Sequence, residues 1–443
     1  MRGVMNLKTR APAFSCLFLL LVLSTSFISG EIPERSISIG LVQAVDMSIA
    51  NDKALQIQDN ELLKSESLHL EARSLLRPQV DLSVNWLYNA DYPQMATTRF
   101  YTDFNVLTKV SASQIITTFG KLDAIVSSSK HKVKISTYEK DALEDNIVYT
   151  TKVTYNNLVL ADRLSKIRRS SYENALKNKS ILEDRSANGR VSKNDNIKIE
   201  SDVFARVSPM KVASSRYLQT LDSLKNQIGV SLDTDLVLEE EYKSVHYILD
   251  ENLMIIKMKQ YHPVIKALEE VILLSQQLVK AKKAEYYPNI SAHASWQNKG
   301  GSNDYYVGRR NLENYSEVAL SLSLPLYNGG KRKEQLSQAK VDEDISIIRL
   351  RKIEEDLQLD LTTSITKYNH LLQTFSSNDR AVEFAEKAFK FSQELFETGQ
   401  ISVTDLNDAE FRLTNQRLKQ ELDFFELYNV AAKIESLVGD IVL

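Results

Sequence analysis

Two aspartates near the C-terminal end of the chain have a spacing that would let their carboxylates act together. Asp405 and Asp408 stand three positions apart, so a helix would carry both side chains on one face, where they could attract a cation. Both would equally suit the first turn of a helix, because the helix dipole favours acidic side chains there. The local sequence leaves these two explanations open.

The rest of the sequence offers no catalytic or metal-binding pattern to accompany this pair. None of the six histidines has a partner at metal-ligand spacing. Gly330 and Lys331 do not end a phosphate-binding loop, because Pro325 occupies the place of its first glycine, and no Gly-x-Ser-x-Gly motif is present. We therefore predict that the protein is not an enzyme and that it binds neither a metal nor a cofactor.

Residues 1–30 have the layout of a secretory signal peptide. Three basic residues precede an apolar stretch at positions 14–23, and small residues lead from there to Gly30. The apolar stretch is too short to span a membrane as a helix. We expect cleavage near Gly30, which would remove the only cysteine, Cys16, and with it any thiol or disulfide chemistry.

The composition is that of a folded protein with a slightly acidic balance. The chain has 443 residues, of which 43% are hydrophobic and 26% charged, and a formal net charge of −3. A nucleic-acid-binding protein would need a basic face, so no nucleic-acid partner is expected. Beyond residue 30 no apolar run is long enough for a transmembrane helix, so any entry into a membrane would require strands closed into a barrel.

The sequence repeats itself with an offset of 210 residues. Four pairs of landmarks keep this offset: Pro78 and Pro288, Gly120 and Gly330, Gly189 and Gly399, and Gly229 and Gly439. Because one offset holds across the mature chain, we predict two like structural repeats, residues 31–235 and 236–443.

Each half is expected to contain a helix, two strands, a long helix and a shorter returning helix. Alternating apolar residues predict strands at about 80–90, 106–119, 289–298 and 316–327. Runs without glycine or proline predict long helices at 121–188 and 331–398, each about 100 Å long. The helix before the first strand is expected at about 38–76 in the first half and 263–285 in the second.

Four strands per chain raise an assembly problem, because bacterial barrels start at about eight strands. Unpaired strand edges cannot stand in lipid. If the strands enter a membrane, several copies must therefore share one barrel. Two chains would supply eight strands and three chains twelve, and the strands alone do not decide between these numbers.

Two motifs and their placement resemble the TolC family of outer-membrane efflux proteins. The motifs are Pro325-Leu-Tyr-Asn-Gly329-Gly330-Lys331 and Phe396-x-x-Gly399-x-x-Ser402-x-x-Asp405-Leu-x-Asp408. The resemblance covers essentially the whole mature chain. It implies a mainly α-helical fold with a small transmembrane β part, in which a homotrimer forms a 12-stranded β-barrel in the outer membrane, continuous with an α-helical tunnel through the periplasm.

The resemblance also implies partners and a function. A channel of this kind would sit in outer-membrane lipid and join a periplasmic adaptor, or membrane fusion protein, to an inner-membrane transporter of the RND or ABC type. It would export small molecules or proteins in a tripartite efflux or type I secretion system. The remaining alternative is a periplasmic coiled-coil scaffold or adaptor protein without a pore, and the cargo stays open.

The family's periplasmic entrance can be placed on this sequence. The helix turns after Gly189 and Gly399 would form the tip, where Asp405 and Asp408 match aspartates that line the entrance. Threefold symmetry would turn each aspartate into an acidic ring that attracts cations. The strand-to-helix junction would comprise Pro325, Gly329, Gly330 and Gly120.

The family's closing contacts at this entrance are altered in the present sequence. Asn194 and Asp195 match positions that help to hold the entrance closed, but their expected tyrosine and arginine partners are Phe396 and Ile401 here. Phe396 has no hydroxyl group and Ile401 no charge. The closed state is therefore expected to use another contact, from Arg190 or Lys193, or to be held more loosely.

Overall fold

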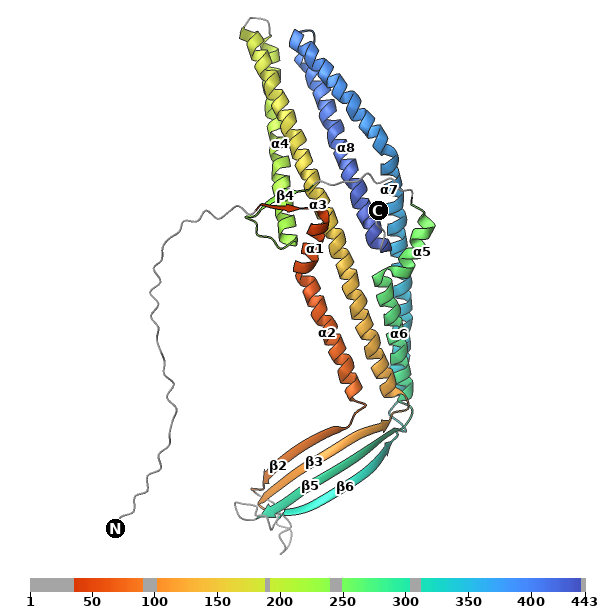
Figure 1. The fold of residues 1–443 in the computed structure, drawn as a ribbon. Helices are drawn as coiled ribbons and strands as arrows, with labels where there is room; N and C mark the ends of the chain where they lie inside the picture. Colours follow the sequence, from red (N-terminus) through yellow and green to blue (C-terminus); the bar gives the residue numbers. More distant parts are fainter. Residues whose placement is uncertain (1–35, 91–101, 188–191, 240–248, 303–311, 440–443) are drawn as a thin grey trace, which may run out of the picture.

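The fold was analysed in a computed structural model, which describes residues 36–90, 102–187, 192–239, 249–302 and 312–439. The expected signal segment 1–30 lies outside these residues, as do Gly189 and Arg190. Within the described part, long helices form an elongated body that stands on a small curved β-sheet (Figure 1). The structure is mostly helical, as the sequence predicts.

The helices of the two halves correspond one to one. The first half contributes α1 (Leu41–Asn51), α2 (Lys53–Ser74), α3 (Lys121–Ala187) and α4 (Lys193–Gln227). The second half contributes α5 (Glu251–Tyr261), α6 (Pro263–Ala284), α7 (Lys331–Thr398) and α8 (Val403–Val438). The helices α3 and α7 run unbroken because their segments contain neither glycine nor proline.

The helices lie side by side in a layer rather than in a closed bundle (Figure 1). Near the sheet the order of neighbours is α2, α3, α6 and α7. Farther from the sheet, α4 replaces α2 and α8 replaces α6, so that the order becomes α4, α3, α8 and α7. The layer therefore has α7 at one edge and the α2 and α4 pair at the other.

The expected single helix over residues 38–76 is wrong, because the chain breaks at Asp52. The Asp52 carboxylate accepts a hydrogen bond from the Leu55 amide at 2.8 Å and so caps α2, while the Asp52 amide donates to the Ser48 carbonyl at 2.9 Å. In the second half, His262 separates α5 from α6, and its Nδ1 accepts from the Val264 amide at 3.2 Å. The sequence predicted the start of α6 at Pro263, but neither α5 nor the break at Asp52.

A two-stranded parallel sheet, which the sequence did not predict, ties the start of the first half to its end. Strand β1 (Ser36–Ile39) pairs with β4 (Asp235–Leu238), with Ser36 opposite Asp235. The Tyr155 hydroxyl group of α3 donates a hydrogen bond to the Glu239 carbonyl at 2.6 Å and holds this sheet against the long helix. A buried apolar cluster around Ile39, Tyr155 and Leu224 surrounds the contact.

The larger sheet has four antiparallel strands in the order β2, β3, β5 and β6. The strands are β2 (Gln79–Tyr88), β3 (Phe104–Thr117), β5 (Asn289–Ser302) and β6 (Leu312–Ser323). Strand β6 ends four residues before the expected position 327. Pro325 explains the early end, because proline has no amide hydrogen to donate to a neighbouring strand.

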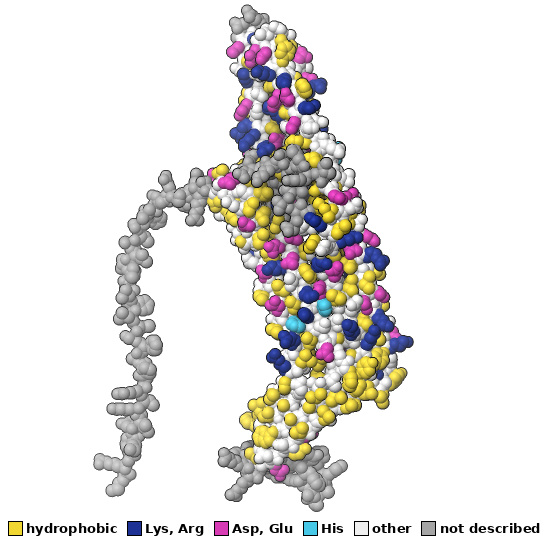
Figure 2. Space-filling model, turned by 45° about the vertical axis from the view of Figure 1, so that its right-hand side comes forward, with side chains coloured by type: hydrophobic (Ala, Val, Ile, Leu, Met, Phe, Trp, Pro, Cys, Tyr) yellow, Lys and Arg dark blue, Asp and Glu magenta, His cyan; other side chains and the backbone are white. Residues whose placement is uncertain are grey.

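The two faces of this sheet differ in polarity. Along β2, the side chains of Val80, Leu82, Val84, Trp86 and Tyr88 share one face, and their partners across β3, β5 and β6 include Val110, Trp296, Val318, Leu320 and Leu322. The opposite face carries mainly polar side chains, among them Asp81, Ser83, Asn85, Lys109, His293, Gln297 and Glu317. Figure 2 shows hydrophobic side chains covering the visible face of the sheet.

Candidate functional site

The tip of the second helical hairpin is built around Gly399. The α7 helix ends there because Gly399 takes a left-handed conformation, with φ at 81°. Its amide donates to the Phe396 carbonyl at 3.0 Å, and the Gln400 amide donates to the Leu395 carbonyl at 2.8 Å. These bonds close the last turn of α7, and Ser402 then starts α8 as its N-cap.

Asp405 is engaged by the start of α8. The Ser402 hydroxyl group and amide donate to its carboxylate at 2.7 and 3.2 Å, and the Asp405 amide donates back to the hydroxyl oxygen at 3.2 Å. The hydrogen bond from the hydroxyl group, and then that from the amide, hold the pKa of Asp405 below its usual value. The carboxylate therefore both caps the helix and stays ionised.

Asp408 lies one turn further along the same helix. Its carboxylate accepts a hydrogen bond from Arg412 Nε at 2.9 Å, and the two side chains are 58% and 73% exposed. Exposed ion pairs of this kind are weak, so Arg412 can move away without a large cost. Within one chain, the charge of Asp408 is therefore partly balanced by Arg412, which the spacing of the two aspartates does not reveal.

The first helical hairpin repeats the capping arrangement. The Ser192 hydroxyl group donates to Asp195 Oδ2 at 2.9 Å, and the Asp195 amide donates to the Ser192 hydroxyl oxygen at 3.1 Å. Ser402 and Asp405 follow these residues by 210 positions. Asn194 is exposed, whereas Asn196 donates from its side chain to Ser186 Oγ at 3.0 Å. The duplication supports a role for both aspartates, Asp195 and Asp405, in starting their helices. This role is compatible with a second role for Asp405 in attracting cations.

Phe396 is held by an arginine from the other half of the chain. Its ring is only 1% exposed and belongs to a buried apolar cluster that also includes Leu182, Ile199 and Leu406. The Arg185 guanidinium lies 5.0 Å from the centre of the Phe396 ring and donates a hydrogen bond to the Phe396 carbonyl. Arg185 therefore links the end of α3 to the end of α7.

No pattern in the sequence points to Arg185. The repeat does not mark this arginine, because the residue 210 positions later is Leu395. The contact also joins residues of different halves, Arg185 of the first and Phe396 of the second. The expected alternatives are placed differently: Arg190 lies outside the described residues, and Lys193 is an exposed residue of the first turn of α4. Ile401 packs partly buried against the cluster that holds Phe396.

A buried ionic network lies below the tip, where α3, α4 and α8 meet. Arg206 of α4 binds the carboxylate of Glu410, which is 2% exposed, and also Asp202 at 2.9 Å and Ser171 Oγ at 2.6 Å. Burial alone would lower the pKa of Arg206, but the hydrogen bonds to Glu410 and Asp202 outweigh it and raise that pKa. The network therefore stays charged and joins the two hairpins.

Glycines form the junction between sheet and helices. Gly120, Gly329 and Gly330 have φ angles of 95°, 67° and 86°, which side chains with a Cβ rarely adopt. Pro325 stands between the end of β6 and this turn. Arg332 fixes the same segment, because its guanidinium donates to the Leu326 carbonyl at 3.3 Å and to the Glu285 carbonyl at 3.1 Å.

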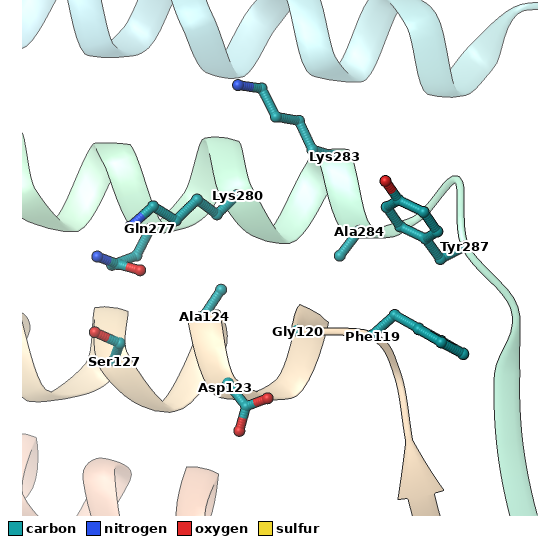
Figure 3. Close-up of a pocket in the computed structure, with 10 residues that line it drawn as sticks. All are labelled: Phe119, Gly120, Asp123, Ala124, Ser127, Gln277, Lys280, Lys283, Ala284 and Tyr287. Carbon is teal, nitrogen blue, oxygen red and sulfur yellow. The ribbon is translucent and has the colours of Figure 1, made fainter.

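A cavity of about 440 Å³ lies beside this junction, between α3 and α6. The Phe119 and Tyr287 rings stack at 6.1 Å at the end nearest the strands, and Figure 3 shows Gln277 and Lys280 farther along α6. Its lining brings together no pair of groups suited to acid–base or nucleophilic chemistry. Among the described residues there is also no group of acids, histidines and cysteines able to hold a metal ion.

None of the described helices combines the length and the apolar character needed to cross a membrane. The candidate site consists of residues of the tip: Asp405, Asp408, Asn194, Asp195, Phe396 and Arg185. The ends of α3 and α7 and the starts of α4 and α8, which carry these residues, lie at the end of the molecule farthest from the sheet (Figure 1). A tip of this kind can attract ions and hold two hairpins together, but it contains no reactive pair.

Residues 256–439 match the protein family described as outer membrane efflux protein. No match was found among curated protein sequences. The structure is similar to the Campylobacter jejuni CmeC outer membrane channel, with a TM-score of 0.81 and 15% identity over 90% of this chain and 85% of that chain. It is also similar to the outer membrane protein VceC from Vibrio cholerae, with a TM-score of 0.79 and 15% identity over 90% of this chain and 96% of that one.

A third similar structure is that of CusC, with a TM-score of 0.78 and 15% identity over 90% of this chain and 92% of that chain. At such low identities, these likenesses show that the fold is shared. They cover 90% of this chain, whereas the family match covers residues 256–439, within the second half alone.

Proposed function

Since residues 256–439 form an outer membrane efflux protein domain, we propose that this chain is one subunit of a trimeric channel-tunnel that exports small molecules or proteins. The match confirms the resemblance to the TolC family and the location in the outer membrane. In this proposal the sheet lies in the membrane and the helices extend into the periplasm, where an adaptor protein and an inner-membrane transporter of the RND or ABC type complete a tripartite efflux or type I secretion system.

The observation that carries the proposal is that the four-stranded sheet of a single chain is open at both edges. The sheet ends in two strands, β2 and β6, which each have a neighbour on one side only. Open strand edges are not tolerated in lipid, so the sheet must be completed by further copies. Three copies of a four-stranded sheet give a barrel of twelve strands, within the range of bacterial barrels.

The polarity of the sheet supports a barrel with a water-filled interior. One face presents large apolar side chains that are open to the surroundings in a single chain, such as Trp86 at 82% and Val318 at 86% exposure. The other face presents serines, asparagines and charged residues. A barrel that encloses the polar face and turns the apolar face outward would satisfy both water and lipid.

The tip is proposed as the entrance of the tunnel. Asp405 and Asp408 would form acidic rings around the threefold axis, and within each chain the hydrogen bonds from Ser402 lower the pKa of Asp405. Arg185 would take over the closing role that Phe396 and Ile401 cannot perform with polar groups of their own, because it ties the ends of α3 and α7 together within each chain.

The test is to purify the protein from outer membranes in detergent and to insert it into planar lipid bilayers. We expect a trimer that resists SDS until it is boiled and a steady single-channel current. The alternative, a periplasmic coiled-coil scaffold or adaptor protein without a pore, would produce no current in the bilayer. Protein that stays monomeric and folded in buffer without detergent would refute the proposal.

A further inference from the structure

The cavity between α3 and α6 changes character along its length. At the end nearest the strands, the Phe119 and Tyr287 rings stack with their centres 6.1 Å apart (Figure 3). Farther along the two helices, its lining consists of Ser127, Gln277 and Lys280 (Figure 3). The cavity is therefore apolar toward the sheet and polar toward the helical body.

The charged side chains of this lining are mainly positive. They are Lys280, Lys283 and a single aspartate. Both lysines are exposed, and neither forms an ion pair with an acidic group of the described residues. By contrast, Lys121 and Lys282, which belong to the same ends of α3 and α6, both bind Glu285, at 3.2 and 3.3 Å. The two cavity lysines are thus available to an anion from outside the chain.

The positions of the two lysines suit a ligand that enters from the surface. In Figure 3 the Lys280 side chain lies along α6, and the Lys283 side chain points away from α3. Each ammonium group ends a flexible four-carbon stem, so both can turn toward a phosphate group at the polar end of the cavity.

Phe119 has a backbone conformation that phenylalanine rarely adopts. Its φ angle is 49°, and in the described part of the chain it is the only residue other than glycine with a positive φ. The residue 210 positions later is Gly329, with φ at 67°, so the repeated turn suits glycine. The turn itself does not need a large ring that is 48% exposed, which indicates that the ring has a use of its own.

Other lining residues also differ between the two halves. Lys280 corresponds to Leu70, and Tyr287 corresponds to Arg77. The turn glycine Gly120, by contrast, has Gly330 as its counterpart. The rings and the lysine of the cavity are therefore not required by the fold that the two halves share.

The cavity lies at the level where the sheet meets the helices. Figure 2 shows hydrophobic side chains that continue from the visible face of the sheet to the ends of the helices. In the channel proposed above, this level is the boundary between membrane and periplasm. Because α3 and α6 are the two inner helices of the layer near the sheet, the cavity is not at an edge where another copy would attach.

We propose that this cavity binds an anionic phospholipid of the surrounding membrane, an inference that rests on the proposed channel. The acyl chains would lie toward the sheet, beside the Phe119 and Tyr287 rings, and the headgroup phosphate would lie at the polar end, close to Lys280. Aromatic rings and lysines favour the boundary between membrane and water. The volume of about 440 Å³ is typical of small-ligand pockets and suits the headgroup, while the acyl chains would stay outside on the apolar surface.

Native mass spectrometry of the purified trimer tests the site, because it counts the phospholipids bound to each assembly. Protein extracted in detergent and freed of lipid is titrated with phosphatidylglycerol, and with phosphatidylcholine of the same acyl chains as the neutral comparison. Glycerol 3-phosphate, which carries the phosphate without acyl chains, separates a lipid site from a site for soluble anions. We expect one tightly bound phosphatidylglycerol per subunit and weaker binding of both other probes.

The lysines are tested by Lys280→Gln combined with Lys283→Gln. This variant should raise the apparent Kd for phosphatidylglycerol about 30-fold, because each lysine near an anionic headgroup contributes about 1 kcal/mol, a factor of about five. The matched control is Lys121→Gln combined with Lys282→Gln. It removes two lysines from the same helix ends, but these bind Glu285 and do not line the cavity.

The apolar end is tested separately by Phe119→Gly. Because Gly329 occupies the corresponding turn, this variant should keep the trimer intact while it loses one of the two rings. We expect weaker binding of phosphatidylglycerol and an unchanged amount of SDS-resistant trimer. Unchanged lipid binding in this variant would overturn the role of the ring and with it the proposed position of the acyl chains.

Three results would overturn the lipid site and leave the channel intact. They are unchanged phosphatidylglycerol binding in the cavity-lysine variant, an equal loss in its control, and binding of phosphatidylcholine or glycerol 3-phosphate as tight as that of phosphatidylglycerol. Protein that stays monomeric and folded without detergent would instead refute the channel on which the inference rests.

Discussion

At the scale of single residues, Arg185 is the contact that decides how tightly the tip is held. It stacks on Phe396 and donates to the Phe396 carbonyl, and both interactions join α3 to α7. A guanidinium over an aromatic ring contributes about 0.5–2 kcal/mol, depending on its exposure. Because Phe396 is fully buried, loss of the arginine would also uncover the edge of an apolar cluster.

We predict that Arg185→Ala loosens the tip and raises the single-channel conductance. Arg185→Lys should restore little, because an ammonium group lacks the flat surface that lies against the ring. Lys177→Ala is the matched control, since Lys177 of α3 also reaches α7, through Glu397 at 3.8 Å, but both side chains are about half exposed. An unchanged conductance in Arg185→Ala would show that the tip is closed by other contacts.

Asp405 and Asp408 are predicted to bind divalent cations and thereby block the current. The double variant Asp405→Asn with Asp408→Asn should abolish this block, because it removes both rings of charge while the asparagine at 405 can still cap α8. Glu397→Gln is the control, since Glu397 is a half-exposed acid in the last turn of α7 that belongs to neither ring. Block that persists in the double variant would remove both aspartates from the site.

The pH dependence of the block by divalent cations is expected to follow from the lowered pKa of Asp405. A carboxyl group with a lowered pKa stays ionised as the pH falls through the range in which an ordinary aspartate takes up a proton. In the single variant Asp408→Asn, where Asp405 alone remains, block should therefore persist further into acid than is usual for an aspartate. Replacing Ser402 by alanine in that variant should move the loss of block to higher pH.

The sequence predicted the two aspartates but not their neighbours. Their spacing and the turn glycine are local features, which a sequence displays directly. Ser402, three residues before Asp405, was also within reach of local reasoning as an N-cap. Arg185 was not, because its contact with Phe396 joins residues 211 positions apart and depends on how two hairpins pack.

At the scale of secondary-structure elements, a helix or strand could be predicted where the local sequence marks it, by the presence or absence of glycine and proline or by alternating apolar residues. The long helices follow from the absence of glycine and proline, and the strands from alternation of apolar and polar residues. The break at Asp52 has no such signal, because aspartate also occurs within helices. Strands β1 and β4, with four residues each, are too short for an alternating pattern and form by pairing with each other.

Asp52 is predicted to stabilise the start of α2. Asp52→Ala removes the cap on the Leu55 amide and should cost about 1 kcal/mol, seen as a lower unfolding temperature of the purified protein. Asp46→Ala is the control, because Asp46 is an exposed residue of α1. Asp52→Asn should behave like the unaltered protein, since its side-chain oxygen can accept the same bond. Equal unfolding temperatures for Asp52→Ala and the control would rule out the cap as a stabilising contact.

At the scale of the whole molecule, the repeat explains why a single chain leaves so much apolar surface uncovered. Positions that are buried between neighbours in the middle of the layer recur at its edges, where in the proposed trimer the neighbour would belong to another copy. Isolated soluble domains rarely expose large contiguous apolar patches. In the proposed assembly, lipid would cover the apolar face of the sheet and a partner chain would cover the exposed edge of α7.

The polarity of the sheet gives a prediction for the assembled protein. Val84 and Asn85 are neighbours in the middle of β2, but their side chains point to opposite faces. A lysine on the lipid-facing side of a barrel costs about 2–4 kcal/mol near the middle of the membrane, whereas one on the water-filled side costs little. Val84→Lys should therefore reduce the amount of SDS-resistant trimer in outer membranes.

Asn85→Lys should leave that trimer at its normal level, because the new charge would stay in water. The two variants carry the same charge at adjacent positions of one strand, so a general effect of lysine on synthesis or export would reduce both alike. Immunoblots of unboiled outer-membrane fractions measure the difference. If Asn85→Lys were the more damaging change, the polar face would be the one turned toward lipid, and the proposed arrangement of the barrel would be inverted.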